Sequence, residues 1–502
     1  MKKDSLYSLF LLPVLGRKDS TDLAFCINGE EFSYSQLYDA IEQICSLVSR
    51  LDEDIIGLYA TDDIRTYAAI IALWISGKSY LPLNPSQPKE RHIEVISSVH
   101  SHYILSCDPS YDMGMKDVQA IYTTSVQTNS YSRQGNIHIA EVPETTLAYI
   151  LFTSGSTGKP KGVQISRGNV AAFIDSMNHT DLDITAQDRC LQPFDFTFDI
   201  SVSGYVIPLI WGASIYTIPT KAIKFTHIAM LLEKYHLTIL QMVPSMIRNL
   251  IPYLDEVELG SIRYNILAGE ALTSKLTQTW HSGNPEMIIY NMYGPTENTV
   301  FCTYYKIDKS NINKPICSND VISIGKSFCN SRAIIVDEND TVIEAANIEG
   351  ELCLSGQQLT SGYWENDYEN ERRFFYFENT RFYRTGDLCH YDPEKNIMYV
   401  GRKDFQVKIN GFRVELGEIE SRYNIISKGK FAIVMPFVNE QDNTELAIII
   451  EGDEYDYKKD KQQLADELPA YEVPSKWLFI RNIPLNTNGK VDRKTIKQHF
   501  NL

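Results

Sequence analysis

Short apolar runs of strand length alternate with helical patterns up to about residue 400 of the chain. DIIGLYA (54–60) precedes a helical stretch at 65–77, and a predicted helix at 227–237 runs into TILQMV (238–243). Further strand candidates are SHYILS (101–106), TLAYILFTS (146–154) and RYNILAG (263–269). Alternation of this kind produces α/β layers with largely parallel sheets. We therefore predict a large N-terminal domain of layered, mostly parallel sheets with helices.

A smaller unit begins near GRKDFQVKINGF (401–412). A helix candidate at 416–425 and a charged helix at 456–468 are interspersed with strand candidates at 431–437, 445–452 and 477–483. Because 502 residues exceed the usual size of a single core, more than one domain is expected. We place the boundary at Asp404, which gives domains 1–403 and 404–502, the second a small α+β module.

The overall charge and the cysteines limit the classes of function. A formal net charge of −17 argues against a nucleic-acid partner, which would need basic surface to neutralise backbone phosphates. The nine cysteines are dispersed, without a CxxC pair or a histidine at metal-ligand spacing, which is typical of reduced thiols in a cytoplasmic protein.

The N-terminal stretch MKKDSLYSLFLLPVLG imitates a signal peptide. Asp4 interrupts its start and Pro13 and Gly16 cut the apolar run, so we predict a short amphipathic helix packed on the body. No other apolar run approaches the roughly 18 residues of a membrane span, and none is expected to cross a membrane.

The stretch TSGSTGKPKG (153–162) combines glycines, hydroxyls and lysines in a pattern suited to phosphate. A Walker loop requires Gly-Lys-Ser/Thr opening a helix, with another glycine five residues before the first. Here Pro160 follows Lys159, and Thr153 stands where the earlier glycine belongs. Proline lacks an amide donor and disfavours helical geometry at the residue before it. We predict a turn between extended segments that wraps a polyphosphate; the alternative is a solvated Gly/Ser turn.

This loop and a series of further motifs resemble the adenylate-forming superfamily, which includes acyl-CoA synthetases, luciferases and the adenylation domains of nonribosomal peptide synthetases. The resemblance covers nearly the whole chain. The motifs follow the family's order: FSYSQL (32–37), SGKSYLPLNPSQPKER (76–91), FDISV (198–202), NMYGPTENTV (291–300), GELCLSGQQLTSGYW (350–364), YRTGDL (383–388), GRKDFQVKINGFRVELGEIE (401–420), LPAYEVP (468–474) and NGKVDRK (488–494).

The resemblance implies a reaction in two halves with ATP and Mg²⁺ as cofactors. A carboxylate attacks the α-phosphorus of ATP to give an acyl-adenylate and pyrophosphate, and a thiol then takes the acyl group. Lys490, in NGKVDRK, would bridge the substrate carboxylate and the α-phosphate, and Thr296 and Glu297 would contact the α-phosphate and Mg²⁺. Asp404 would be the hinge on which the small domain rotates between the two halves.

The same resemblance assigns the nucleotide contacts. Tyr293 would stack on adenine with Asn291 at its edge, Asp387 would accept from the ribose hydroxyls, and Arg402 would lie near the ribose or phosphate. The full set carried over is Thr153, Ser154, Gly155, Ser156, Thr157, Gly158, Lys159 and Lys161 for the β- and γ-phosphates, with Gly269, Glu270, Asn291, Met292, Tyr293, Gly294, Thr296, Asp387, Arg402 and Lys490.

The aspartate of FDISV indicates which kind of carboxylic acid is activated. In amino-acid-activating members this aspartate, here Asp199, pairs with the substrate ammonium, whereas activators of fatty and aryl acids generally lack it. A buried carboxylate is costly unless a cation meets it; the alternative is a cap for a helix starting at Ser201. The pocket positions carried over by motif offset are Asp199, Ile200, Ser203, Gln241, Ile266, Ala268, Met292, Val300 and Phe301. They predict an amino acid with a small or medium, uncharged side chain.

Several enzymes fit this pattern. The leading hypothesis is an amino-acid adenylating ligase that loads the phosphopantetheine thiol of a separate carrier protein, because no carrier serine motif follows residue 494. A D-alanine–carrier protein ligase is an alternative, although Ala268 takes the place of its usual cysteine before Gly269-Glu270. A CoA ligase for a non-amino acid and a catalytically inactive relative are the others; Lys490 and Glu297 argue against the last.

Overall fold

Strands and helices alternate through the first three hundred residues of the computed structural model, as the sequence predicts. The structure describes residues 4–127, 133, 135, 137–153, 160–220, 222–404, 406–484 and 491–502. It divides into two compact units, of which the first comprises Met1–Pro85, Ile96–Leu151 and Gly162–Lys403. The second comprises Ser86–Val95, Phe152–Lys161 and Asp404–Leu502. Each unit is described by itself.

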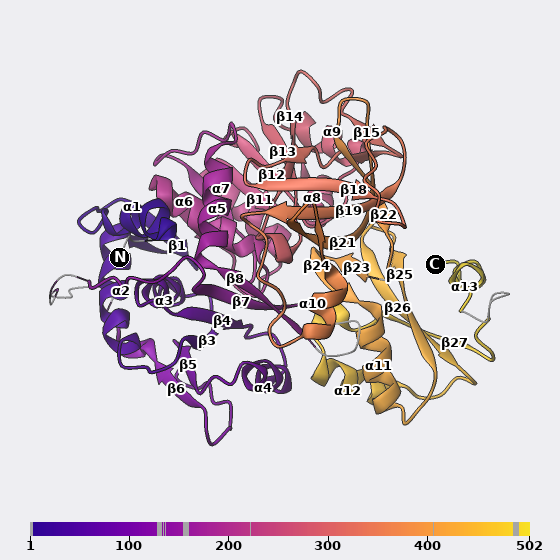
Figure 1. Cartoon of the computed structure of the whole chain (residues 1–502), viewed down its shortest axis with the longest axis horizontal. Coiled ribbons are helices and arrows are strands. Elements are labelled where there is room, and N and C mark those ends of the chain that lie inside the picture. The colour runs from indigo at the N-terminus through magenta and orange to yellow at the C-terminus, as the bar shows by residue number, and fades with distance from the viewer. Residues whose placement is uncertain are drawn as a thin grey trace. The chain divides into compact units, whose positions relative to one another are not determined.

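The largest sheet of the first unit has, within the described ranges, the order β17-β14-β13-β12-β11-β9-β10-β1-β2. Its strands β11, β12, β13 and β14 are labelled in Figure 1. Its central strands, from β1 to β13, are parallel, while β2, β14 and β17 pair antiparallel at the two edges. The strands are β1 Leu23–Ile27, β2 Glu30–Ser33, β9 Arg189–Gln192, β10 Ser214–Thr217, β11 Ile239–Met242, β12 Tyr264–Leu267, β13 Ile288–Tyr293, β14 Thr303–Ile307 and β17 Lys326–Ser327.

A second sheet has the order β6-β5-β3-β4-β7-β8, and β3 pairs parallel with both β4 and β5. Its strands are β3 Ile55–Tyr59, β4 Ser79–Leu83, β5 Tyr103–Ser106, β6 Gln119–Tyr122, β7 Leu147–Thr153 and β8 Lys161–Ser166. The helices of the first unit that accompany these sheets are α2 Tyr34–Val48, α3 Ile64–Ile75, α5 Arg167–Asn178, α6 Ile200–Trp211, α7 Lys224–Tyr235, α8 Pro244–Leu250 and α9 Ser274–Ser282. Helix α4 Lys89–Ser98 has residues in both units. The prediction of layered, mostly parallel sheets with helices is confirmed for this part of the chain.

The alternating pattern did not predict the third sheet, which is antiparallel throughout. Its order is β18-β19-β21-β20, with β22 on the other side of β21. The strands are β18 Ser331–Val336, β19 Gly350–Gly356, β20 Phe374–Phe377, β21 Thr380–Tyr391 and β22 Ile397–Arg402, with α10 Asp367–Arg373 before β20 and the small pair β15 Cys317–Ser318 and β16 Val321–Ile322 nearby in sequence. Consecutive antiparallel strands need no crossover helix, so most of this segment lacks the strand–helix alternation that predicts a parallel sheet.

The N-terminal stretch packs on the body, as predicted. A π-helical turn, Tyr7–Leu11, leads into α1 Leu12–Leu15, and Leu6, Phe10 and Leu11 are fully buried. Phe10 contacts Trp74 edge-on at 5.4 Å between ring centroids. Among the described residues, no helix is long and apolar enough to cross a membrane.

The second unit has its own apolar core beneath two small sheets. A hairpin joins β23 Gln406–Ile409 and β24 Phe412–Glu415, and the other sheet has the order β25-β26-β27. Its remaining elements are β25 Ala432–Val438, β26 Thr444–Glu451, β27 Lys476–Ile480, α11 Leu416–Ile426, α12 Lys458–Glu467 and α13 Arg493–Phe500. The mixture of antiparallel pairs, one parallel pair and packed helices is an α+β module, as predicted.

Candidate functional site

Three parallel strands of the first unit end side by side at residues that the sequence singles out. Gln241 of β11 pairs in register with Ile266 of β12, and Leu267 of β12 pairs with Asn291 of β13. In open α/β sheets, ligands bind at the carboxyl ends of the strands. The loops that follow β12 and β13 carry Ala268 to Glu270 and Gly294 to Phe301. The main sheet therefore gathers most of the predicted substrate positions at one edge.

Tyr293, the last residue of β13, is held by the antiparallel sheet. Its hydroxyl donates a 2.5 Å hydrogen bond to Asp387 Oδ2, and both side chains are buried. Arg402 Nη1 donates to Asp387 Oδ1 at 2.9 Å across the β21–β22 pair. Burial, and then the Asp387 charge, raise the pKa of Tyr293 well above its ordinary value, so the phenol stays protonated as a donor. The structure thus joins three predicted nucleotide residues in one chain of hydrogen bonds.

Glu297 lies in the 3-10 turn Thr296–Asn298, directly after the GP dipeptide of the YGPTE motif. Its side chain is buried, and its Oε1 accepts a 2.6 Å hydrogen bond from the Tyr363 hydroxyl. The Tyr363 hydroxyl also lies 3.3 Å from the Tyr383 hydroxyl, and Tyr363 forms an isolated bridge with Val163 of β8. One buried carboxylate oriented by a tyrosine fits Mg²⁺, which is usually bound through one or two carboxylates and substrate phosphates.

Tyr363 was not among the residues singled out by sequence. It is the penultimate residue of the motif GELCLSGQQLTSGYW, and it lies 66 residues from Glu297 in the chain. Its place in a motif was the only signal, and nothing in the motif indicates which residue its hydroxyl contacts.

The loop between Glu297 and Phe301 is strained. Thr299 and Val300 both have positive φ, at 52° and 67°, a region that β-branched residues rarely adopt. Gln358 holds the loop in place: its amide donates to the Phe301 carbonyl at 2.7 Å, and its own carbonyl accepts from Thr299 Oγ1 at 2.6 Å. Backbone strain of this kind is found where surrounding structure over-determines a binding site. The buried Phe301 ring contacts Phe173 of α5 edge-on at 6.2 Å.

Gln358 is positioned by α5. This helix begins with a reciprocal capping box between Ser166 and Asn169, which satisfies two of its unpaired amides. The Asn169 amide also donates to the carbonyls of Gln357 and Leu359, at 2.8 and 3.0 Å. Ser176, farther along the helix, donates to Gln358 Oε1 at 2.8 Å. The same helix therefore supports Phe301 directly and through Gln358.

Asp199 occupies the N-cap position of α6, but its side chain does not cap the helix. Its side chain makes no capping hydrogen bond, and its backbone is already helical, at φ −60° and ψ −26°. The helix-cap alternative for this aspartate is therefore wrong. Its carboxylate is 4% exposed, and its charge contributes to raising the pKa values of Tyr80 and Tyr149, whose main cause is burial. Asp199 thus lies near the buried tyrosines Tyr80 and Tyr149. The Tyr80 hydroxyl is in turn 3.0 Å from the Tyr205 hydroxyl.

Three of the other predicted pocket positions line one small cavity beside α6. The Gln241 amide donates to the Ile200 carbonyl at 2.8 Å and ties β11 to the first turn of the helix. Ser203, Gln241 and Ile266 line a small cavity of about 20 Å³ together with apolar side chains such as Leu191 and Ile207. This volume holds about one water-sized group. In the part of the chain that the structure describes, the buried Ser203 hydroxyl has no hydrogen-bond partner.

Two predicted nucleotide residues are engaged elsewhere. The Asn291 amide donates to the Ser323 carbonyl at 2.8 Å, so this group braces the loop before β17. Glu270 accepts from the amide and hydroxyl of Ser245, both at 2.8 Å, and lies 3.5 Å from Arg248. Gly269 adopts a φ of +84°, which lets the chain turn sharply before Glu270.

The other predicted residues belong to the second unit or lie outside the described residues. Thr153 donates weakly to the Lys161 carbonyl at 3.5 Å, and Lys161 is buried at the start of β8. Asp404 begins the last segment of the second unit, where its carboxylate accepts from the Gln406 amide at 3.3 Å. Ser154, Gly155, Ser156, Thr157, Gly158, Lys159 and Lys490 lie outside the residues that the structure describes.

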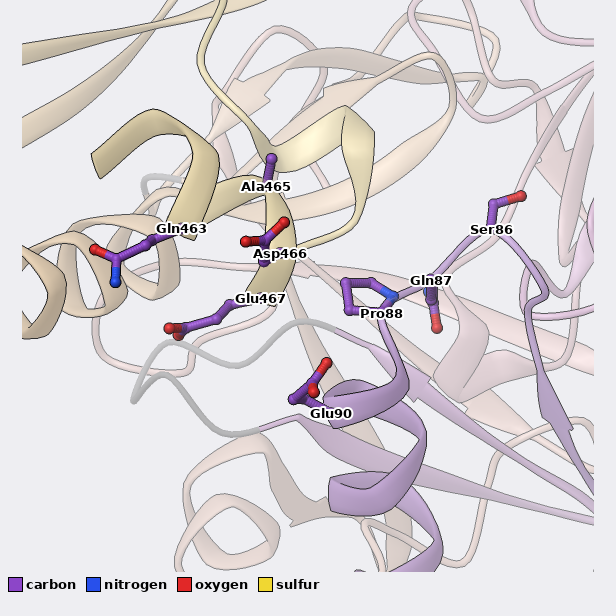
Figure 2. A pocket seen from close by; sticks show the side chains of 8 residues that line it. All are labelled: Ser86, Gln87, Pro88, Glu90, Gln463, Ala465, Asp466 and Glu467. Carbon is purple, nitrogen blue, oxygen red and sulfur yellow. The ribbon is translucent and has the colours of Figure 1, made fainter. Parts of the chain in front are cut away.

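The second unit carries a separate surface hollow. Figure 2 shows that it is lined by Ser86, Gln87, Pro88, Glu90, Gln463, Ala465, Asp466 and Glu467. Three of these eight side chains are carboxylates and none is a cation. An anionic ligand such as a nucleotide or a carboxylic acid would be repelled there, so the candidate site is the edge of the main sheet.

A two-unit α/β architecture with these motifs at the ends of parallel strands defines the adenylate-forming superfamily. The model of the AMP-binding enzyme family matches residues 16–364, and the chain belongs to this family. The sequence-based resemblance is thereby confirmed.

Peptide synthases are among the similar curated proteins. Tyrocidine synthase 2 from Brevibacillus parabrevis is 31% identical over 505 residues, which cover 97% of this chain and 13% of that protein. Bacitracin synthase 3 from Bacillus licheniformis is 29% identical over 507 residues, which cover 99% of this chain and 8% of that protein. The chain therefore spans a small part of the length of these relatives.

Solved structures share the fold. PA1221, a protein containing adenylation and PCP domains and bound to a vinylsulfonamide inhibitor, has a TM-score of 0.84 at 22% identity, covering 98% of this chain and 85% of that chain. The Vibrio cholerae adenylation domain AlmE in complex with glycyl-adenosine-5′-phosphate has a TM-score of 0.83 at 23% identity, covering 100% and 98%. The predicted fold class is confirmed.

Proposed function

We propose that this chain activates an amino acid with ATP and transfers it to a thiol. In the first half, a carboxylate oxygen of the amino acid attacks the α-phosphorus of ATP, and the bond to the pyrophosphate leaving group breaks. In the second half, a thiolate attacks the acyl carbon, and AMP leaves with the electron pair of the acyl–oxygen bond. Family membership supports the adenylating half of the reaction. The inference that the acid is an amino acid depends on Asp199.

The observation that carries the proposal is the position of Asp199. A carboxylate at 4% exposure stands at the head of α6, does not cap the helix, and faces the buried tyrosines beside the predicted pocket. A buried charge is tolerated best opposite a complementary charge. A substrate ammonium would supply this charge, while the pocket behind α6 would receive the substrate side chain.

The hydrogen-bonded group at β13, β21 and β22 would hold the nucleoside. Asp387 would accept from the ribose hydroxyls, and Arg402 and Tyr293 fix its carboxylate by donating to its two oxygens. Tyr293 would at the same time present its ring to the adenine. The bracing of Asn291 against Ser323 sets the position of the strand end on which the adenine would rest.

Glu297 would hold Mg²⁺, and Thr296 would contact the α-phosphate. The ion, when bound, neutralises phosphate charge and orients the polyphosphate for in-line displacement. The Tyr363 hydroxyl, by donating to Glu297 Oε1, would direct the carboxylate toward the metal.

Lys490 would supply the positive charge that stabilises the transition state, and the 153–161 loop would hold the β- and γ-phosphates. We further propose that domains 1–403 and 404–502 move as units about Asp404 after adenylation. Withdrawal of Lys490 would then make room for the thiol.

The proposed acceptor is the phosphopantetheine arm of a carrier protein. Support comes from the 29 to 31% identity to peptide synthases and from folds shared with proteins that contain adenylation and PCP domains. The pocket positions favour a small or medium, uncharged side chain, since the small cavity behind Ser203 adds room for about one heavy atom. A D-alanine–carrier protein ligase has the same site chemistry and differs only in substrate.

The test is ATP–pyrophosphate exchange over a panel of L-, D- and β-amino acids, including D-alanine. Asp199→Ala and Asp199→Asn should each abolish amino-acid-dependent exchange, while thermal unfolding shows that both variants are folded. The matched control is Asp183→Asn, an aspartate whose side chain is 81% exposed. Unchanged amino-acid-dependent exchange in both Asp199 variants would reject the ammonium-binding role of Asp199. Absence of exchange with every amino acid of the panel in the unaltered chain would reject the amino-acid substrate and favour a CoA ligase for a non-amino acid.

Lys490→Ala separates the two halves of the reaction. The variant should be crippled in adenylate formation yet retain thioester formation from a supplied aminoacyl-adenylate. Loss of both halves together would contradict the role proposed for Lys490.

A further inference from the structure

Three potential metal ligands of different chemistry meet on the surface of the first unit. Asp175 lies near the end of α5, His179 is its C-terminal cap, and Cys329 follows β17. One ligand atom from each residue lies within 4.8 Å of the others. We propose that Asp175, His179 and Cys329 form a Zn²⁺ site, which is independent of the function proposed above.

The histidine is already in the tautomer that binds a metal. His179 Nδ1 lies 2.7 Å from the Asp175 carbonyl oxygen. A carbonyl oxygen only accepts, so Nδ1 carries the proton and Nε2 keeps its lone pair. Metal-binding histidines almost always donate their other ring N–H to a carbonyl or carboxylate in this way.

The Asp175 carboxylate is also oriented by a hydrogen bond. Asn330 Nδ2 donates to Asp175 Oδ2 at 2.8 Å, and also to the Ala172 carbonyl at 3.1 Å. The amide thereby fixes the orientation of the carboxylate relative to α5. Because Asn330 follows Cys329 directly, the same contact holds the thiol beside the helix end.

The ligand set selects the ion. A thiolate, an imidazole and a carboxylate together suit Zn²⁺, whereas Mg²⁺ and Ca²⁺ prefer oxygen ligands alone. Zinc–ligand bonds of about 2.0 to 2.3 Å place tetrahedral ligands roughly 3.3 to 3.7 Å apart. The present spacing, within 4.8 Å, is wider than this, so metal binding requires the side chains to close in around the ion, and His179 and Cys329 are exposed. Three protein ligands leave a fourth position for water.

The site joins two segments that support the substrate pocket. Phe173 and Ser176 of α5 contact Phe301 and Gln358, and the amide of Phe328 donates to the Cys302 carbonyl at 2.7 Å. A bound ion would therefore cross-link the end of α5 to the segment that follows Phe301. Binding to the folded state alone stabilises it by mass action.

Cobalt(II) titration of the metal-free, untagged full chain tests the proposal, because cobalt reports thiolate ligation by a charge-transfer absorption band. The expected result is a band that saturates at one equivalent and is displaced by Zn²⁺. Cys329→Ser should remove the band, and His179→Gln and Asp175→Asn should weaken binding at least about tenfold. Cys317→Ser is the matched control, since Cys317 is the other exposed cysteine of the nine.

Absence of the band, its persistence in Cys329→Ser, or its loss in Cys317→Ser would overturn the proposal. Zinc should also raise the thermal unfolding midpoint of the unaltered chain and of Cys317→Ser but not of His179→Gln. An equal rise in His179→Gln would place the zinc elsewhere. Asn330→Ala should weaken cobalt binding about tenfold, because its amide orients the Asp175 carboxylate for the metal.

Discussion

The hydroxyl of Tyr363 donates a 2.6 Å hydrogen bond to Oε1 of Glu297, and both side chains are buried. The bond connects the loop after β13 to the loop after β19, and the bridge between Tyr363 and Val163 extends the connection to β8. Three segments from distant parts of the chain therefore fix the orientation of one carboxylate.

Replacement of Tyr363 by phenylalanine removes this donor while keeping the ring in place. We expect the Mg²⁺ concentration for half-maximal pyrophosphate exchange to rise about tenfold, in the range typical of partners that orient metal ligands. Tyr376→Phe, at a tyrosine that is 74% exposed, is the control. An unchanged magnesium dependence would contradict an orienting role for Tyr363.

Two substitutions of Ser203 distinguish an effect on the stability of the fold from an effect on the shape of the substrate pocket. Its buried hydroxyl has no partner among the described residues, so Ser203→Ala should leave stability unchanged or raise it by up to about 1 kcal/mol. Ser203→Val should instead fill the cavity and shift the amino-acid preference toward smaller side chains. Thermal unfolding and exchange kinetics over the substrate panel measure the two effects. A preference unaffected by valine would show that the cavity is not part of the substrate pocket.

Stability of the second unit should fall as pH rises above the ordinary glutamate range. Glu472 is 1% exposed, and burial, followed by the charge of Glu418, raises its pKa to about 8 from 4.5. Between these values the folded chain holds a proton that the unfolded chain releases, so the stability is present at low pH and is lost toward pH 8. The slope is about 1.4 kcal/mol per pH unit at most, the value for one proton.

Glu472→Gln should flatten this dependence, and urea denaturation at several pH values between these limits measures it. Glu454→Gln, at an exposed glutamate of the same unit, should retain the slope of the unaltered chain. The same slope in Glu472→Gln would mean that another group causes the pH dependence.

The N-terminal segment is anchored by a buried ion pair between Asp4 and Arg167, whose side chains are 3% and 1% exposed. Asp4→Ala leaves the guanidinium charge buried, and we expect a loss of about 3 kcal/mol or more in the free energy of unfolding. The double variant Asp4→Leu with Arg167→Met should recover most of this loss. Equal losses in the single and double variants would show that packing, and not the unpaired charge, is responsible. Glu286→Ala, which breaks a surface pair with Lys309, should change stability little.

Much of the fold could be predicted because local patterns specify it. The predicted helix at 65–77 is α3, and the predicted strand at 263–269 is β12. Both predictions hold because apolar residues recur at a different spacing in a helix than in a strand. The antiparallel sheet from β18 to β22 was not predicted, because its strands, apart from α10 before β20, are not separated by the helices that alternate with strands in a parallel sheet.

For the candidate site, motif order predicts that Tyr293, Glu297 and Asp387 hold the nucleotide and Mg²⁺; these roles stay predictions, and the structure adds the hydrogen-bond partners of each side chain. Motif order did not indicate that Asn291 and Glu270 are engaged by Ser323 and by Ser245 with Arg248, nor that Asp199 lacks a capping bond. Hydrogen-bond partners depend on which loops meet, and no local pattern encodes that.

The sequence by itself therefore determined the family, the α/β character of the larger domain and the residue types available for chemistry, since these depend on local order and spacing. Tertiary structure alone decided which side chains touch. Cys329 was interpreted as a dispersed thiol because 150 positions separate it from His179 in the chain. Packing of the β17–β18 loop against α5 brings the two together with Asp175, because folding makes neighbours of segments that the chain keeps far apart.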